Sequence, residues 1–162
     1  MIVFNNRWTL WQHEPLNTKW NLDSYNKLIN INNTNEFWSI YQLLNIECLK
    51  YNMLFFMKND IVPLWEDEMN IYGGALSIKV LYKDIYNCWM ELSMALIGEY
   101  ITQNHDDIKK INGISISPKK GFCILKVWTN TNDKIEYNNS IPSLTFNNSI
   151  YKPYNTNVNI KT

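Results

Sequence analysis

Alternating apolar and polar side chains predict several short strands along this chain. In the first, from Asn6 to Trp11, Trp8 and Leu10 share one face, while Thr9 and Trp11 share the other. Further strands are expected at residues 53–57, 75–81, 114–117 and 122–128, with weaker signals at 143–146 and 149–151. The segments 114–117 and 122–128 are separated by a turn sequence, so we expect them to form a β-hairpin.

A helical pattern begins after Asn33, the expected N-cap. Asn33 and Glu36 resemble a capping box, and the helix should run to Leu44 or Asn45. The apolar stripe expected to face the core consists of Phe37, Ile40, Tyr41 and Leu44. Trp38 lies off this stripe, so we expect its ring to point sideways or outward.

A second helix is expected from the cap Asp84 to Tyr100 or Ile101. Steps of 100° per residue place two apolar stripes on it. One, the expected core face, contains Ile85, Trp89, Leu92 and Leu96; the opposite one contains Met90, Met94, Ile97 and Ile101. Two interpretations of the second stripe remain open: a surface for a partner, or a face covered by another part of the same domain.

The length and composition predict one globular domain over residues 1–162, with a flexible tail from about residue 152. No apolar run is long enough to cross a membrane. The 15 basic and 15 acidic residues cancel, which disfavours broad binding to nucleic acid through phosphates. Three widely spaced cysteines and two histidines fit neither a disulfide framework nor a zinc site. With no secretory signal at the start, we expect a cytoplasmic protein.

Motifs for catalysis or for binding cofactors and metals are absent from the sequence. Neither a nucleophile elbow nor a glycine-rich phosphate loop occurs, so we expect no enzymatic activity and no cofactor. His105-Asp106-Asp107 contains residue types suited to acid–base work, but its uniformly polar surroundings favour a solvated loop. Glu66-Asp67-Glu68 could hold a divalent cation, although no second acidic cluster converges on it by spacing.

Tryptophan is the compositional anomaly, because seven occur where a domain of this size needs one or two for its core. Trp20 lies in an expected loop over residues 13–23, and Trp65-Glu66 follows a bend at Pro63. Two parallel tryptophan rings can hold a flat cationic ring between them. An adjacent glutamate can accept both N–H groups on one edge of guanine. These residues would suit 7-methylguanine, although spacing alone favours buried core tryptophans.

At this level of detail the sequence resembles the translation initiation factor 4E family, which binds the 5′ cap of messenger RNA. The similarity extends from about Asn6 to Trp128. It is carried by the segments Asn6-Arg7-Trp8-Thr9-Leu10-Trp11, Lys19-Trp20, Glu36-Phe37-Trp38-Ser39-Ile40-Tyr41, Pro63-Leu64-Trp65-Glu66-Asp67-Glu68, Gly73-Gly74, Trp89-Met90-Glu91-Leu92, Leu96-Ile97-Gly98-Glu99 and Val127-Trp128-Thr129. It implies an α+β fold: a curved antiparallel sheet with helices on its convex face and a cap-binding slot on its concave face.

The resemblance also implies roles for individual residues. Trp20 and Trp65 resemble the stacking pair, Glu66 the carboxylate that reads guanine, and Trp128 the ring that touches the N7-methyl group. Trp38 resembles the residue that receives a helix of the scaffold factor 4G or of a 4E-binding repressor, with a Tyr-x-x-x-x-Leu-hydrophobic motif. The remaining partner-binding residues implied on that surface are Met90, Glu91, Met94 and Gly98.

The chain departs from the family pattern where the cap phosphates bind. Ala75 and Ile124 replace the usual arginine and lysine. We expect Lys119, Lys120 and Lys126 to hold the triphosphate instead, although each could be an ordinary surface lysine. After Trp128 the chain is shorter than usual, so the helix normally found there should be reduced to a loop.

The sequence therefore predicts a monomeric, non-enzymatic cap-binding protein that recruits a scaffold for translation initiation. Two alternatives remain open. A protein of the same fold could sequester capped messages as a repressor or decoy, without recruiting the scaffold. It could instead act only in protein interactions, having lost the cap pocket.

Overall fold

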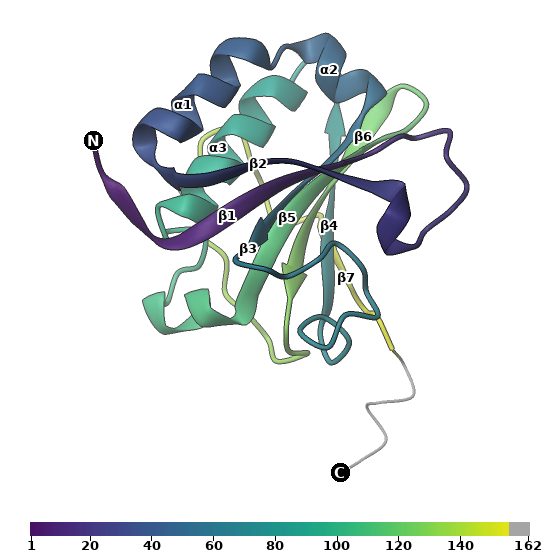
Figure 1. Ribbon diagram of the computed structural model, residues 1–162. Helices are drawn as coiled ribbons and strands as arrows, with labels where there is room; N and C mark the ends of the chain where they lie inside the picture. Colours follow the sequence, from purple (N-terminus) through teal and green to yellow (C-terminus); the bar gives the residue numbers. More distant parts are fainter. Residues whose placement is uncertain (156–162) are drawn as a thin grey trace.

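The computed structural model describes residues 1–155, which form a seven-stranded antiparallel sheet with three α-helices (Figure 1). The strand order is β2-β1-β3-β5-β6-β4-β7. Their bounds are β1 Val3–His13, β2 Tyr25–Asn33, β3 Met53–Lys58, β4 Gly74–Leu81, β5 Ile111–Pro118, β6 Phe122–Thr129 and β7 Ile150–Pro153. The predicted antiparallel architecture is confirmed, including the β5–β6 hairpin.

Two elements of the first third of the chain differ from the prediction. β1 extends past Trp11 to His13, and the segment after its loop forms an edge strand, β2, that the pattern did not reveal. Most of β2 is exposed on both faces, so its sequence lacks the alternation that marks a half-buried strand. The loop between them, with a short 3-10 turn at Leu22–Ser24, carries Trp20.

The helices α1 (Thr34–Leu43), α2 (Ile46–Tyr51) and α3 (Ile85–Ile97) gather on one face of the sheet (Figure 1). The predicted N-cap is confirmed: the side-chain oxygen of Asn33 accepts from the backbone N–H of Glu36 at 3.0 Å. α3 ends earlier than expected because Gly98 caps it and Glu99 has a φ of 61°, a left-handed conformation that stops a helix. None of the helices within residues 1–155 has the length and apolarity to span a membrane.

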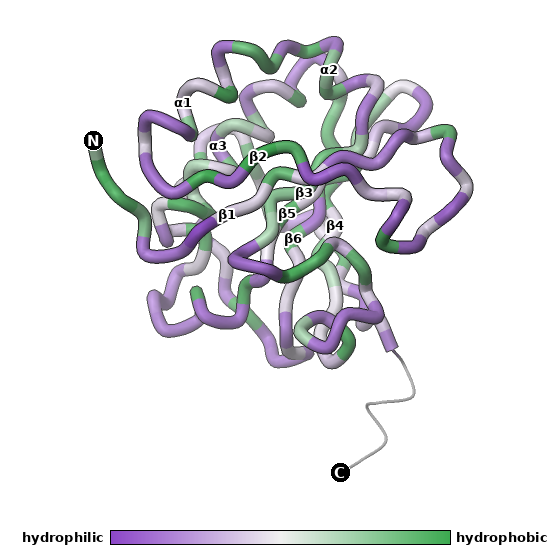
Figure 2. Tube along the Cα trace, in the orientation of Figure 1, coloured by the Kyte–Doolittle hydropathy of each residue, from purple (hydrophilic) through white to green (hydrophobic). Residues whose placement is uncertain are grey.

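Side chains on the two faces of the sheet form two separate clusters. The larger lies between the sheet and the helices, and includes Trp8, Phe56 and Trp89. A smaller cluster lies on the opposite, concave face: Trp11, Phe55, Met57, Ile61 and Trp128. The trace coloured by hydropathy shows the apolar strands of the sheet surrounded by polar loops (Figure 2). Because adjacent residues of β6 alternate between the clusters, the predicted assignment of Val127 to the core face and Trp128 to the other is confirmed.

The second apolar stripe of the α3 region is largely covered by the same chain. Ile97 and Ile101 are only 6% and 0% exposed, and Ile101 lies beyond the end of the helix. The segment around Ile141 and Leu144 is buried in the same cluster, and the backbone N–H of Ser143 donates to the carboxylate of Glu91 at 2.6 Å. The stripe is therefore not the continuous open surface that one of our two interpretations required.

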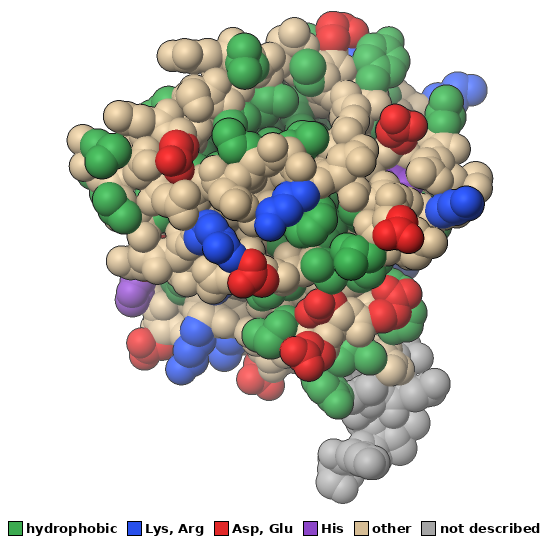
Figure 3. Space-filling model, viewed as in Figure 1, with side chains coloured by type: hydrophobic (Ala, Val, Ile, Leu, Met, Phe, Trp, Pro, Cys, Tyr) green, Lys and Arg blue, Asp and Glu red, His purple; other side chains and the backbone are tan. Residues whose placement is uncertain are grey.

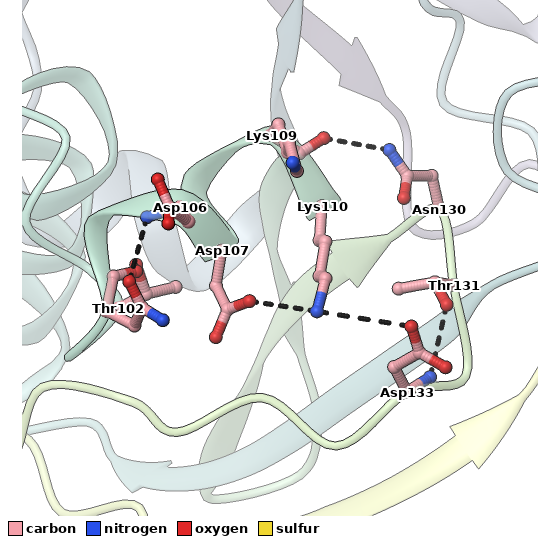
Figure 4. Close-up of polar contacts among 9 residues, drawn as sticks. Thr102, Asp106, Asp107, Lys109, Lys110, Asn130, Thr131 and Asp133 are labelled. Carbon is pink, nitrogen blue, oxygen red and sulfur yellow. Dashed lines mark hydrogen bonds and ion pairs between the residues drawn. The ribbon is translucent and has the colours of Figure 1, made fainter.

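The segment after β6 crosses the molecule without a helix, as expected from its length. Lys110, at the end of the 3-10 helix His105–Lys110, contacts Asp107 at 2.8 Å and Asp133 of this segment at 4.0 Å (Figure 4). Asn130 adds a hydrogen bond to the carbonyl of Lys109. Lys110 and Asn130 thus join the 3-10 helix to this segment, whereas Asp107 pairs with Lys110 within the helix.

A flexible tail was predicted from about residue 152. This predicted start is too early, because Lys152 and Pro153 belong to β7 and pair with β4. Residues 156–162 lie outside the described part of the chain. No strand forms at residues 143–146, whereas the weak signal at 149–151 corresponds to the start of β7. Gly73 and Gly74 permit this arrangement, since a Cβ at either would overlap the backbone of Thr129 or Lys152.

Candidate nucleotide-binding site

A cavity of about 730 Å³ opens on the concave face of the sheet. We call it the concave cavity. Six of the seven predicted cap-binding residues line it: Trp20, Trp65, Glu66, Lys119, Lys126 and Trp128. In Figure 3 this part of the surface, around the loop after β3, shows hydrophobic side chains next to acidic ones. Its volume is in the range of small-molecule sites.

Trp20 is held through its ring. The ring is stacked on that of His13, with centroids 4.0 Å apart and planes 1° from parallel. His13 is fully buried at the end of β1, and its Nε2 lies 2.7 Å from the carbonyl oxygen of Lys19. Tyr25 adds edge contacts to both rings. Because His13 covers one face of Trp20, which is still 50% exposed, the other face remains available for a ligand.

Trp65 is held through its backbone. Asn70, fully buried, donates from its side chain to the carbonyls of Val62 and Leu64 at 3.1 and 2.8 Å. Its own side-chain oxygen accepts from Asn112 of β5 at 2.8 Å. These bonds fix the loop on the N-terminal side of Trp65, whose ring is 44% exposed. The exposed ring is therefore attached to a rigid backbone.

Glu66 follows Trp65 and is exposed at the rim of the concave cavity. Burial raises the pKa of Tyr25 to about 12, and the negative charge of Glu66 contributes to this increase. Tyr25 lies beside Trp20, so the charge of Glu66 acts on the Trp20 side of the cavity. A carboxylate in this position can accept two N–H groups from the edge of a stacked base.

The floor of the cavity is aromatic. The ring of Phe55 in β3 makes edge contacts with the rings of Tyr25 and Trp128, with ring centroids 5.4 and 6.0 Å apart. Trp128 is buried and donates from Nε1 to Ser115 Oγ at 2.9 Å. Tyr154, just after β7, packs against Trp128 at 5.2 Å. Trp128 therefore presents an edge or part of a face to the cavity rather than a free ring.

Two lysines also line the cavity, and we call the part of it that they line the basic end. Lys126 extends from β6 on the same face as Trp128. Lys119 lies in the β5–β6 turn, and its backbone carbonyl accepts a hydrogen bond from the Tyr82 hydroxyl. Burial lowers the pKa of Lys126, and the charges of Lys119 and Lys152 lower it further. Lys120 is exposed in the turn and does not line the cavity.

The residues expected to bind a partner lie on the helical side. Trp38 on α1 is 43% exposed, with edge contacts to Phe37 and Tyr41. Tyr41 joins α1 to α3 by donating to Ser93 Oγ at 2.7 Å. On α3 or at its end, Met90 and Met94 are partly buried against the core, Glu91 binds Ser143, and Gly98 is exposed. This surface is on the opposite side of the sheet from the concave cavity.

Sequence reasoning missed several residues that shape the site. His13 could have been found by continuing the alternation Thr9, Trp11 by one more step. Asn70 carries no signal, because a buried amide that binds backbone looks like any loop asparagine. Lys152 lies in β7, a strand predicted only weakly, and Tyr154 follows that strand. Among the described residues, no group of three or more His, Cys, Asp or Glu side chains could hold a metal ion, and all three cysteines are free thiols.

Comparison with protein families gives a match to the model described as eukaryotic initiation factor 4E, over residues 3–160. Initiation factor 4E of Saccharomyces cerevisiae is 36% identical over 140 residues, which cover 80% of this chain and 62% of the yeast protein. The chain thus spans between half and two-thirds of the length of curated relatives such as those of yeast and Dictyostelium discoideum.

Solved structures agree with the fold. The Ascaris suum factor 4E-3 with an m2,2,7G cap gives a TM-score of 0.76 at 20% identity, covering 95% of this chain and 92% of that one. The schistosome factor 4E with m7GpppG and 4E-BP gives 0.72 at 25% identity, covering 82% and 74%. These similarities confirm the predicted α+β architecture with a curved antiparallel sheet.

Proposed function

Since the chain belongs to the eukaryotic initiation factor 4E family, we propose that it binds the 7-methylguanosine cap of messenger RNA in the concave cavity. The observation that carries this proposal is the pair of half-exposed tryptophans, Trp20 and Trp65, that line one cavity with a carboxylate adjacent in sequence. The solved relatives that contain cap ligands support it. The role is binding, with no chemical step.

The methylated base would lie between the open face of Trp20 and the ring of Trp65. Methylation of N7 makes the base cationic, and a cation over an aromatic face gains about 2 kcal/mol or more when desolvated. The His13 stack supports this arrangement because it orients Trp20 before the ligand arrives, which reduces the ordering cost of binding. Trp65 would complete the sandwich on the other side.

Glu66 would select guanine. Its ionised carboxylate accepts from N1–H and the exocyclic N2–H, which point the same way on the base. Hydrogen bonds to a charged group are worth about 1.5–3 kcal/mol. Trp128, packed between Phe55 and Tyr154, would contact the methyl group as apolar surface.

Lys119 and Lys126 would bind the phosphates at the basic end. Both line the cavity and neither forms an ion pair with a described residue. Lys120 was expected to join them; its exposed place in the turn supports only a peripheral contact. Lysine supplies a mobile point charge rather than the two-pronged geometry of arginine, so this contact should be strongly dependent on salt.

The proposal is tested by titrating the protein with 7-methyl-GTP and with GTP at fixed salt, following tryptophan fluorescence. We expect strong quenching and preferential binding of the methylated ligand. Trp65→Ala should lose about 1–3 kcal/mol, roughly 5- to 150-fold in affinity. Trp38→Ala is a matched control, because that ring is equally exposed but on the opposite side of the sheet. Equal affinity for GTP and 7-methyl-GTP would overturn the proposal.

We also propose that the surface around Trp38 binds a helix of a scaffold or repressor protein. Trp38 is a large ring, 43% exposed, supported from two sides by Phe37 and Tyr41. The schistosome relative was solved with 4E-BP. Because Glu91 is engaged by Ser143 and the methionines are partly covered, we expect Trp38 and the exposed end of α3 at Gly98 to carry most of the contact.

Binding of a helical peptide with the motif Tyr-x-x-x-x-Leu-hydrophobic, lost in Trp38→Ala and kept in Trp65→Ala, would support this second proposal. No binding by the wild-type protein would contradict it and favour the decoy role, in which capped messages are held without a scaffold. Translation of a capped reporter in a depleted extract separates activator from repressor: addition raises the yield in the first case and lowers it in the second.

A further inference from the structure

A groove of about 560 Å³ lies at one end of the sheet, next to the concave cavity. We call it the end groove. Three segments meet there: the loop after β1, the last turn of α2 and the turn between β5 and β6 (Figure 1). Lys119 lines both the end groove and the concave cavity, so the two adjoin. No other predicted cap-binding or partner-binding residue lines the end groove.

Large apolar side chains line the end groove and are exposed in it. Tyr51, the last residue of α2, is 68% exposed, and Leu16, in the loop after β1, is almost fully exposed. Pro15 and Pro118 line the groove with them. Exposed apolar side chains that gather in one hollow mark a binding surface. A tyrosine ring among them can stack on any nucleic-acid base, because every base has a flat π-face.

Two fixed amides also line the end groove. Gln12 Nε2 donates to Asn52 Oδ1 at 2.6 Å, and Asn26 Nδ2 donates to Gln12 Oε1 at 3.3 Å. Asn52 Nδ2 donates in turn to the carbonyl of Cys48 at 2.9 Å. These bonds leave one N–H of Gln12 and one lone pair of Asn52 Oδ1 for a ligand. A fixed donor beside a fixed acceptor matches the polar edge of a base.

The charges of the end groove favour a base inside it and phosphates beside it. Lys119 forms no ion pair with a described carboxylate, and its backbone N–H donates to the carbonyl of Phe122 at 2.8 Å, which fixes the turn. Lys50 also lines the groove, but it contacts Glu47 at 3.3 Å. Glu14 lines the groove as well. A carboxylate repels a phosphate but accepts N–H groups of a base.

We infer that the end groove binds the base of the nucleotide that follows the cap, stacked on Tyr51 and covered by Leu16. This inference rests on the proposed cap binding and adds a second base site outside the concave cavity. A triphosphate bridge that reaches Lys119 ends beside the groove, so the nucleotide attached to it enters the groove directly. Proteins that recognise single-stranded RNA hold unstacked bases on aromatic side chains in this way.

The test compares 7-methyl-GTP with the capped dinucleotide m7GpppA by fluorescence titration at fixed salt. Only m7GpppA carries a base beyond the triphosphate. Removing a ring under a stacked base weakens binding roughly 5- to 150-fold, and the exposed Tyr51 ring should lie at the lower end of this range. Tyr51→Ala should therefore weaken binding of m7GpppA about five- to tenfold and that of 7-methyl-GTP less than about twofold. Tyr51→Phe keeps the ring and should bind both ligands like wild type.

Tyr72→Ala is the matched control. Tyr72 is 61% exposed and lines neither the concave cavity nor the end groove. Its replacement should change neither affinity by more than about twofold. Leu16→Ser alters the groove from a different segment and should weaken binding of m7GpppA alone, by about two- to threefold. Because Tyr51 and Leu16 are both exposed, neither substitution should prevent folding.

The outcomes separate this inference from the proposed function. If wild type prefers 7-methyl-GTP to GTP but Tyr51→Ala weakens both methylated ligands equally, or neither, the base does not lie in the end groove and cap binding stands. If Tyr51→Phe loses as much as Tyr51→Ala, stacking is wrong. If Tyr51→Ala instead loses the Tyr-x-x-x-x-Leu-hydrophobic peptide, the groove is a protein surface and the inference is overturned. If wild type shows no preference for the methylated base, the proposed function fails, and this inference with it.

Discussion

The two loops that carry Trp20 and Trp65 reach the concave cavity by different means. Trp20 is fixed at its ring, by the stack on His13 and the edge of Tyr25, in a loop with few backbone ties. Trp65 is fixed at its backbone, by the buried amide of Asn70, with no ring contact within the described structure. The ring of Trp20 is therefore fixed before a ligand binds, while the ring of Trp65 can rotate about its side-chain bonds. A flat ligand would stack first on Trp20 and would then be covered by Trp65.

Breaking the backbone ties of the second loop should have the largest effect. Asn70→Asp keeps the size of the side chain but cannot donate to the carbonyls of Val62 and Leu64. We expect a loss of about 2–4 kcal/mol in the free energy of unfolding, measured by urea denaturation, because buried acceptors lose their donor. Cap affinity should fall to that of Trp65→Ala. A destabilisation below about 1 kcal/mol would mean that the loop is held by other contacts.

Glu66 depends on the same loop and comes next. Glu66→Gln removes the charge but not the shape, and one of its two acceptors becomes a donor facing the base. The loss in binding of 7-methyl-GTP should be about 1.5–3 kcal/mol, or 10- to 150-fold, by fluorescence titration. Glu68→Gln, two residues away and exposed, is the control and should bind like wild type. Similar affinities for the Glu66 variant and wild type would remove Glu66 from the site.

The role of the stack that fixes Trp20 is tested at His13. His13→Ala removes the stack behind Trp20, and aromatic pairs contribute about 0.5–1.5 kcal/mol beyond their burial. We expect cap affinity to fall by a similar amount, and the fluorescence anisotropy of Trp20 to decrease in a variant without the other exposed tryptophans. His13→Phe restores a ring of similar size and should recover both. If His13→Phe behaves like His13→Ala, the hydrogen bond to Lys19 rather than the stack positions Trp20.

The smallest effect, and one of opposite sign for stability and binding, is expected at Lys126. Burial and neighbouring lysines lower the pKa of Lys126. At neutral pH the charged form of this side chain is therefore less favourable in the folded protein than in the unfolded chain. Stability should therefore rise with pH through the window from that lowered pKa to the ordinary lysine value, because the unfolded state binds more protons there. In Lys126→Met this rise should be reduced.

At pH 7, Lys126→Met should unfold at the same or a slightly higher denaturant concentration than wild type, yet bind 7-methyl-GTP more weakly. A residue that costs stability and supports a ligand is common in binding sites. A clear loss of stability in Lys126→Met would show that the aliphatic part of the side chain matters for packing more than its charge costs.

The parts of this molecule predictable from sequence were those with a strong local pattern. The N-cap at Asn33, the strands β1, β3, β4 and β6, and the outward place of Trp38 follow from periodicity and capping. The set Trp20, Trp65, Glu66 and Trp128 came from a family resemblance, and the structure places all four around one cavity. Spacing alone could not have brought together residues from three separate segments.

The parts that could not be predicted depend on long-range packing. The exposed edge strand β2 has no alternation, so its pairing with β1 provides the stability that its sequence does not signal. The cover over Ile97 and Ile101 comes from residues some 40 positions later, which a helical wheel does not include. The amide of Asn70 is buried and oriented by Asn112, a partner distant in sequence that no local pattern reveals.

The idea that Trp20 is fixed before binding while Trp65 turns onto the base is tested most directly by a crystal structure of the complex with 7-methyl-GTP. We expect the base to lie parallel between Trp20 and Trp65, with the carboxylate of Glu66 accepting from its N1–H and N2–H. The Trp20–His13 stack should remain as it is at 4.0 Å, while the Trp65 ring turns onto the base. A base bound outside the concave cavity, or one that displaces Trp20 from His13 and leaves Trp65 unmoved, would contradict this arrangement.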